Sequence, residues 1–193
     1  MSRRLVLASA SPRRRQLLGW LGVDFEVDPA AVDETQRPGE APTDFVCRMA
    51  TEKAKAVATR HPGAVVLAAD TEVVLNGEAL GKPGTRDRAA EMLSRLSGRT
   101  HQVLSAVAVG DGAALQTRLV RSEVRFSRLT PAAIAWYVET GEPLDKAGAY
   151  ALQGRGAALV ARVEGSPTGI IGLPLEETAA LLAAAGVEVP WCR

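Results

Sequence analysis

The sequence has 193 residues, 47% hydrophobic and 23% charged, a balance that predicts a folded chain with a core and excludes a disordered one. Its 23 lysines and arginines stand against 22 acidic residues, so the net charge of +1 gives no global field for nucleic acid or an anionic membrane. Two histidines and two distant cysteines, Cys47 and Cys192, exclude a His-rich metal centre and a disulfide framework.

In chain order, hydrophobic runs and capping residues predict alternating strands and helices. Ser11 and Thr130 each precede a proline, as residues that cap helices do, and Asn76-Gly77 predicts a hairpin turn. Residues 23–42 are expected to be mostly loop because prolines and acids dominate them. The expected strands are residues 4–9, 64–69, 73–75, 101–109, 115–126 and 159–163. The expected helices are residues 12–20, 43–61 (capped by Thr43), 85–96 (started by Thr85), 131–141 and 176–185.

This alternation predicts an α/β fold, and the hairpins make its sheet mixed rather than purely parallel. No repeat, low-complexity linker or charge block interrupts the pattern, so we expect one domain over residues 1–193. The apolar run after the basic start covers only Leu5 to Ala10, which is too short for a signal peptide or a membrane span. We therefore expect a soluble cytoplasmic protein.

The first turn of the helix at residues 12–20 carries three consecutive arginines, Arg13, Arg14 and Arg15. A helix N-terminus is already partly positive, so cations there cost stability unless an anion is bound. The preceding strand and the Ser9-Ala10-Ser11-Pro12 segment also direct free backbone N–H groups beyond the strand end. This pattern favours a phosphate site, and the alternative is an exposed turn of solvated arginines.

Lys53 and Asp70 break the apolar patterns in which they lie. Lys53 is four residues from both Met49 and Val57 on the apolar stripe of its helix, so it needs a partner or a cavity, unless its long side chain reaches solvent. Asp70 closes the apolar strand at residues 64–69, where α/β folds bind ligands, and could bind a metal or accept a proton from water. The alternative for Asp70 is a common turn-starting aspartate.

Two glycine motifs do not match nucleotide-binding signatures. Gly81-Lys82-Pro83 is not a P-loop, because Gly77 lies too near and a proline stands where Ser or Thr is required. Gly154-Arg155-Gly156 lacks the third glycine of the dinucleotide fingerprint. Such glycines serve equally well as turn residues or as positions where the backbone approaches a ligand closely.

Taken together, these stretches resemble the Maf family of nucleoside triphosphate pyrophosphatases. The matching segments run in order from residue 5 to residue 175 and so cover nearly the whole chain. They are Leu7-Ala8-Ser9-Ala10-Ser11-Pro12-Arg13-Arg14, Ala69-Asp70-Thr71-Glu72-Val73-Val74, Gly81-Lys82-Pro83, Ser97-Gly98-Arg99-Thr100-His101-Gln102-Val103, Gly141-Glu142-Pro143-Leu144-Asp145-Lys146-Ala147-Gly148-Ala149-Tyr150 and Gly172-Leu173-Pro174.

The resemblance implies an elongated mixed α/β sheet with flanking helices and a cleft between two lobes, similar to inosine triphosphate pyrophosphatases. It implies hydrolysis of a nucleoside triphosphate to the monophosphate and pyrophosphate with a divalent cation, Mg²⁺ or Mn²⁺. Asp70 matches the family's proposed proton acceptor, and Glu34 is a second acid that would help Asp70 to place the metal. The residues that would bind the triphosphate are Ser9, Arg13, Lys53, Lys82 and Lys146.

The resemblance also implies a nucleotide preference. Arg13, Thr71 and Gln153 match the branch that acts on dTTP and UTP rather than the branch that acts on 7-methylguanosine triphosphate. The amide of Gln153 can both donate and accept, which suits the edge of uracil or thymine. Residues 165–169 lack the aromatic residues frequent in that branch, and if those residues shape the base pocket, the pocket here is expected to be wider. The expected substrates are dTTP and UTP, with modified pyrimidine nucleotides as an option.

Other functions remain to be compared with this one. A non-catalytic nucleotide-binding regulator of septum formation or cell division is the alternative, but it would not need the set of Asp70, Lys53 and Lys82. A nucleic-acid-binding module conflicts with the +1 charge and with only 4% aromatic residues. A homodimer is expected from the family resemblance alone.

Overall fold

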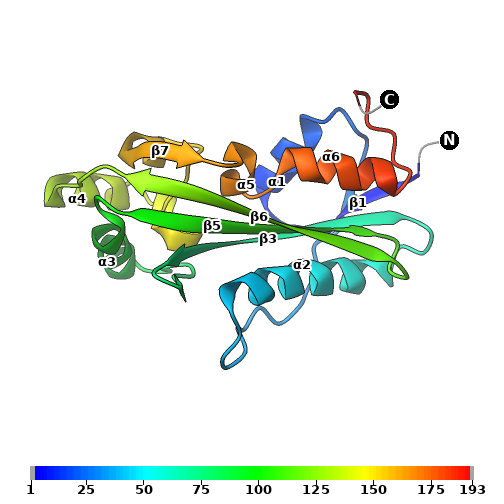
Figure 1. Cartoon of the computed structure of the whole chain (residues 1–193), viewed down its shortest axis with the longest axis horizontal. Helices are drawn as coiled ribbons and strands as arrows, with labels where there is room; N and C mark the ends of the chain where they lie inside the picture. Colours follow the sequence, from blue (N-terminus) through cyan, green and yellow to red (C-terminus); the bar gives the residue numbers. More distant parts are fainter. Residues whose placement is uncertain (1–2, 192–193) are drawn as a thin grey trace. The chain divides into compact units, whose positions relative to one another are not determined.

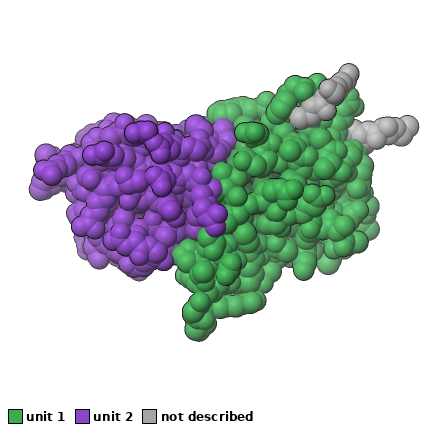
Figure 2. Space-filling model, viewed as in Figure 1, with its two compact units in different colours: residues 1–70, 105–120, 172–193 green, residues 71–104, 121–171 purple. Residues whose placement is uncertain are grey.

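The computed structural model describes residues 3–191, so Cys192 lies outside the described part. The chain forms two compact units, shown in different colours in Figure 2. Unit 1 comprises Met1–Asp70, Ser105–Val120 and Gly172–Arg193, and unit 2 comprises Thr71–Leu104 and Arg121–Ile171. Each unit therefore combines segments that are far apart in the sequence.

The described residues form a seven-stranded sheet in the order β2-β1-β3-β5-β6-β7, with β4 paired to β3 outside this path (Figure 1). The strands are β1 (Leu5–Leu7), β2 (Glu26–Val27), β3 (Val65–Leu75), β4 (Glu78–Ala79), β5 (Thr100–Gly110), β6 (Leu115–Phe126) and β7 (Val160–Glu164). The helices are α1 (Pro12–Gly19), α2 (Pro42–Ala58), α3 (Arg86–Leu96), α4 (Pro131–Glu139), α5 (Pro167–Ile171) and α6 (Leu175–Ala184), with 3-10 segments η1 (Glu142–Asp145), η2 (Ala147–Ala149) and η3 (Arg155–Leu159). The mixed α/β fold expected from the sequence is confirmed.

Unit 1 contains the parallel part of the sheet. β1 pairs in parallel with both β2 and β3, and Leu5–Leu7 lies opposite Val65–Leu67. The side chains of β1 are at most 2% exposed, as expected for a strand that is covered on both faces. Leu17 of α1, Met49 of α2 and Leu182 of α6 are fully buried and extend the same core.

Unit 2 contains the antiparallel pairs β3–β4 and β6–β7 and an aromatic core. His101 contacts Phe126 and Tyr150 edge to face, with ring centroids 5.2 and 5.3 Å apart, and its Nε2 lies 2.8 Å from the Tyr150 hydroxyl. His101 Nδ1 is buried without a partner, and burial lowers the pKa of the imidazole to about 4. His101 is therefore a neutral core residue.

Helix capping followed the sequence at three helices and departed from it at one. Ser11, Thr85 and Thr130 accept a hydrogen bond from the backbone N–H three residues later. The expectation for Thr43 was wrong, because α2 begins one residue earlier, at Pro42. Ala41 is the N-cap residue, and its side chain makes no capping hydrogen bond.

The strand around Asp70 is longer than the sequence predicts. β3 continues through Asp70 and Thr71 to Leu75, before the Asn76-Gly77 turn, where both residues have positive φ. The expectation that Asp70 ends its strand was therefore wrong. β1 stops pairing with β3 at Leu67, so Asp70 still lies beyond the end of the parallel pairing, the position at which α/β sheets commonly bind ligands.

The surface of each unit carries tryptophan. Trp20 and Trp191 of unit 1 are 58% and 62% exposed, and Trp136 of unit 2 is 49% exposed. These are all the tryptophans of the chain. Across residues 3–191, every helix is too short or too polar to traverse a bilayer.

Candidate active site

In unit 1, Lys53 joins two carboxylates. Its Nζ lies 2.7 Å from Asp70 Oδ1 and 3.0 Å from Glu34 Oε1. Lys53 and Asp70 are only 7% and 8% exposed, whereas the side chain of Glu34 is half exposed. The partner that the sequence analysis sought for Lys53 is therefore Asp70, reached from the buried face of α2. Because both charges are largely removed from water, each holds the other in place.

The N-terminus of α1 adds cations to this cluster. Arg14 Nε donates to the carbonyl of Gly172 at 2.9 Å. Burial lowers the pKa of the Arg14 guanidinium, while the charges of Asp70 and Glu34 oppose that change and the charge of Arg13 adds to it. Arg14 therefore lies in the electrostatic field of Asp70 and Glu34, and Arg13, its neighbour in the chain, adds a further positive charge. A local excess of positive charge favours an anionic ligand.

Arg14 was missed as a site residue, although it belongs to the arginine run that the sequence analysis singled out. Arg13 and Arg14 are half-buried, whereas Arg15 is exposed. The available signal was the position of Arg14 in the quoted segment of the Maf resemblance. The buried Ser9 Oγ accepts a hydrogen bond from Ser11 N at 3.2 Å, so it helps to shape the turn that starts α1.

The segment that carries Glu34 has no regular structure, and Arg48 of α2 holds it. Arg48 Nε and Nη2 donate to the two carboxylate oxygens of Glu40 at 2.6 and 2.7 Å, and Nη2 also reaches the carbonyl of Thr35 at 3.1 Å. This hydrogen-bonded partner lowers the pKa of Glu40 to about 2. Arg48 therefore fixes residues 35 and 40, on the C-terminal side of Glu34.

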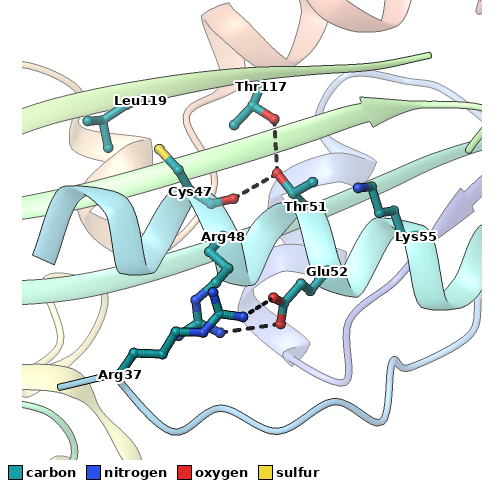
Figure 3. Close-up of a pocket in the computed structure, with 8 residues that line it drawn as sticks. All are labelled: Arg37, Cys47, Arg48, Thr51, Glu52, Lys55, Thr117 and Leu119. Atoms are coloured by element: carbon teal, nitrogen blue, oxygen red, sulfur yellow. Dashed lines mark hydrogen bonds and ion pairs between the residues drawn. The ribbon is translucent and has the colours of Figure 1, made fainter. Parts of the chain in front are cut away.

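A groove of about 500 Å³ lies beside this ion network, along the outer face of α2 and next to β6 (Figure 3). Thr51 Oγ1 lies 3.2 Å from Thr117 Oγ1 and so ties α2 to β6. Arg48 and Arg37, which line the groove, both pair with Glu52, as the dashed lines in Figure 3 show. Their charges are thus already balanced within unit 1.

Unit 2 carries the other predicted site residues: Thr71, Lys82, Lys146 and Gln153. The backbone segments that bear the two lysines lie side by side, because Gly148 N donates to Gly81 O at 2.9 Å and Gly84 N to Leu144 O at 3.2 Å. The buried carboxylate of Glu72 accepts Gly81 N at 3.0 Å and fixes the residue before Lys82.

The two lysines of unit 2 differ in their surroundings. Lys82 is exposed, whereas Lys146 is half-buried and its Nζ donates to Asp145 Oδ1 at 2.6 Å and to Glu142 O at 2.8 Å. Lys146 is thus held against its own segment, and a phosphate would compete with the exposed carboxylate of Asp145 for its ammonium group. Thr71 and Gln153 are half-buried.

The two carboxylates in unit 1 suit a magnesium or manganese ion whose other ligands are water and the oxygens of a bound phosphate group. Among residues 3–191, no group of three His, Cys, Asp or Glu side chains could hold a metal alone. Asp70 and Glu34 do approach one another, because both contact the same lysine amine. Mg²⁺ is usually bound by one or two carboxylates together with phosphate oxygens and water, so these two residues fit it.

The chain is similar in sequence to a known protein family and to several curated proteins. Residues 4–185 match the family described as Maf-like protein. The chain is 58% identical to a dTTP/UTP pyrophosphatase of Anaeromyxobacter dehalogenans strain 2CP-1, covering 100% of both chains. It is 56% identical to a dTTP/UTP pyrophosphatase of Myxococcus xanthus (97% of this chain, 95% of that one) and 49% identical to one of Symbiobacterium thermophilum (96% and 95%).

Among solved structures, a HAM1 protein from Coxiella burnetii aligns with 95% of this chain and 94% of its own, with 18% identity and a TM-score of 0.49.

Proposed function

The chain belongs to the family of Maf-like proteins, and from this premise we propose that it hydrolyses dTTP and UTP to the monophosphate and pyrophosphate. The observation that carries the proposal is the buried Asp70–Lys53 pair, which Glu34 joins from a more exposed position and which interacts with Arg14 of α1. A carboxylate fixed among cations suits attack of water on a polyanion, because the cations stabilise charge that develops on the phosphorus. The names of relatives that match nearly the whole chain support the same substrates.

In this proposal Asp70 accepts the proton of the attacking water. Lys53 binds one oxygen of the Asp70 carboxylate at 2.7 Å, which fixes its orientation and leaves the second oxygen to take the proton. Asp70 and Glu34 hold the divalent cation, which supplies Lewis-acid polarisation of the phosphates when it is bound. The residues that bind the triphosphate are Ser9, Arg13, Lys53, Lys82 and Lys146.

The preference for dTTP and UTP is assigned to Arg13, Thr71 and Gln153. The amide of Gln153 presents one donor and one acceptor to the pyrimidine edge, which is the pattern that uracil and thymine offer in return. Modified pyrimidine nucleotides belong to the same substrate class. The proposal also includes a cytoplasmic location and a homodimer, and size-exclusion chromatography with light scattering tests the dimer.

The decisive experiment is a panel of nucleoside triphosphates, with products identified after incubation with purified protein and Mg²⁺. We expect pyrophosphate and the monophosphate, with dTTP and UTP turned over best. Asp70→Asn is expected to lower the rate about 10²–10⁴-fold while nucleotide binding persists. Asp24→Asn, which changes an exposed carboxylate of the same unit, is the matched control.

Three results would contradict the proposal. Release of orthophosphate from the γ-position would show a different reaction. Unchanged turnover in Asp70→Asn would remove Asp70 from the mechanism. Binding of nucleotides by the wild-type protein without any turnover would instead favour a non-catalytic regulator.

A further inference from the structure

The carboxylate of Glu142 in unit 2 collects three hydrogen bonds from separate groups. Oε1 accepts from the hydroxyl of Tyr137 at 2.8 Å and from Gly156 N at 3.0 Å, and Oε2 accepts from Arg155 N at 3.0 Å. Burial raises the pKa of Glu142, but these hydrogen bonds outweigh burial and bring the pKa below its ordinary value. The side chain is therefore an ionised group that only accepts hydrogen bonds, here including two from backbone N–H groups.

Tyr137, which donates to Glu142, also binds the backbone on the N-terminal side of Gln153. Its ring is fully buried in α4, and its hydroxyl accepts a hydrogen bond from Ala151 N at 3.1 Å. The backbone is thus held two residues before Gln153 through Tyr137, and two and three residues after it through Glu142. We call this pair, Tyr137 and Glu142, the bracket.

The bracket accounts for the Gly154-Arg155-Gly156 motif, which matched no cofactor signature. A Cβ at position 154 would lie 2.7 Å from Glu142 Oε2, and the φ of +138° there also excludes ordinary side chains. A Cβ at position 156 would lie 2.5 Å from the Tyr137 hydroxyl and 2.5 Å from Ala151 O. Both glycines are required because the backbone lies directly against the bracket.

From these contacts we propose that Tyr137 and Glu142 are positioning residues that set the nucleotide preference by fixing Gln153. The inference rests on the proposed function, in which Gln153 reads the pyrimidine edge. An amide discriminates uracil from cytosine only if its donor and acceptor meet the matching atoms of the base. A small displacement loses that match, and a backbone held on both sides limits it.

The test compares kcat/KM for UTP and CTP in the wild type and in Tyr137→Phe, which removes a single oxygen atom. We expect the UTP-to-CTP ratio to fall about tenfold, the size of one lost hydrogen bond, mainly through a higher KM for UTP. Glu142→Gln retains the shape but loses the charge, and we expect a similar fall. Trp136→Phe, at the exposed neighbouring position of α4, is the matched control and should keep the wild-type ratio.

Gln153→Ala identifies the path of the effect. If the bracket acts through Gln153, the double variant Tyr137→Phe/Gln153→Ala has the same ratio as Gln153→Ala alone. The inference would be overturned if Gln153→Ala lowers the UTP-to-CTP ratio while neither Tyr137→Phe nor Glu142→Gln changes it. A further fall of the ratio in the double variant would also overturn it.

Failure of the proposed function would look different. In that case the wild type would release no pyrophosphate from any nucleotide, and the inference would fall with it. If the wild type turns over UTP and Gln153→Ala leaves the ratio unchanged, the pyrophosphatase reaction stands and the bracket inference is wrong. Circular dichroism spectra check the fold of each variant, and Glu142→Gln decides the question if Tyr137→Phe does not fold.

Discussion

Two irregular segments that carry candidate site residues are fixed in different ways. In unit 1, Arg48 holds the segment around Glu34 through the opposite charge of Glu40. In unit 2, a carboxylate and a buried hydroxyl hold residues 151–156 through backbone N–H groups. The first anchor is an ion pair between two charged side chains, and the second joins an ionised carboxylate to neutral backbone N–H groups along a path that needs Gly154 and Gly156. Loss of a charge should therefore weaken either anchor, whereas an added side chain at Gly154 or Gly156 should disturb only the anchor of unit 2.

The largest expected effect comes from breaking the ion pair in unit 1. Lys53→Met leaves the buried carboxylate of Asp70 without its cation, which should lower the free energy of unfolding by about 3–5 kcal/mol. Urea unfolding followed by circular dichroism measures it. The double variant Lys53→Met/Asp70→Asn removes the uncompensated charge and should recover part of this loss. Equal stability of the single and double variants would contradict this explanation.

The next effect concerns the pH at which each unit loses stability. The pKa of His101 in unit 2 is about 4 in the folded chain and 6.5 when unfolded, so as the pH falls through 6.5 the unfolded state takes up the proton first. The stabilisation is complete above pH 6.5, and about 3 kcal/mol of it is lost progressively down to pH 4. Glu40 of unit 1, with a pKa of about 2 against 4.5, loses its contribution as the pH falls from about 4.5 to 2, which is mostly below that window.

Unfolding by urea at pH 7, 5.5 and 4 measures this dependence. His101→Gln cannot titrate in this range, so its stability should vary less between pH 6.5 and 4, even if it is lower throughout. Identical pH slopes for the variant and the wild type would assign the acid sensitivity to other groups.

A smaller effect tests the charged anchor of unit 1. Arg48→Met frees residues 35 and 40, so Glu34 should lose its fixed position and Mn²⁺ affinity should fall about tenfold. Electron paramagnetic resonance of Mn²⁺ with a non-hydrolysable UTP analogue measures this without turnover. Arg60→Met is the control, because Arg60 ties the earlier residues Asp28 and Pro29 to the end of α2. An equal loss in both variants would refute a specific role for Arg48.

The smallest effect concerns the start of α2. Ala41 has the extended backbone of an N-cap residue but no side chain to accept a hydrogen bond, so Ala41→Ser should stabilise the protein by about 0.5–1 kcal/mol. Thr43→Ala should change stability by less than about 0.5 kcal/mol, because Thr43 does not cap the helix. Thermal unfolding of the two variants measures the difference, and a larger loss in Thr43→Ala would contradict the assigned helix start.

The features that could be predicted from the sequence are those that depend on neighbouring residues. Ser11, Thr85 and Thr130 cap helices through bonds to residues three positions away, and the Asn76-Gly77 turn depends on those two residues alone. Lys53 was recognised as anomalous because a stripe of apolar residues surrounds it in the sequence. Its partner Asp70, 17 residues away, required the fold.

The rest could not be read from local patterns. Three consecutive arginines are alike in their local pattern, and the contact of Arg14 with Gly172, 158 residues away, depends on the fold. Asp70 and Thr71 interrupt an apolar run, so the local pattern predicted a strand end at a point where β3 continues to Leu75. Lys82, Lys146 and Gln153 were assigned through resemblance, because nothing in their neighbourhood marks them as unusual.

The exposure of every tryptophan in this chain decides how its folding can be followed. Indole rings that are already hydrated in the native state emit much like those of the denatured chain, so intrinsic fluorescence will report unfolding weakly. The same exposure makes the rings accessible to aqueous quenchers. Trp136, next to the buried Tyr137 in α4, thereby becomes an optical reporter of unit 2 once Trp20 and Trp191 are replaced.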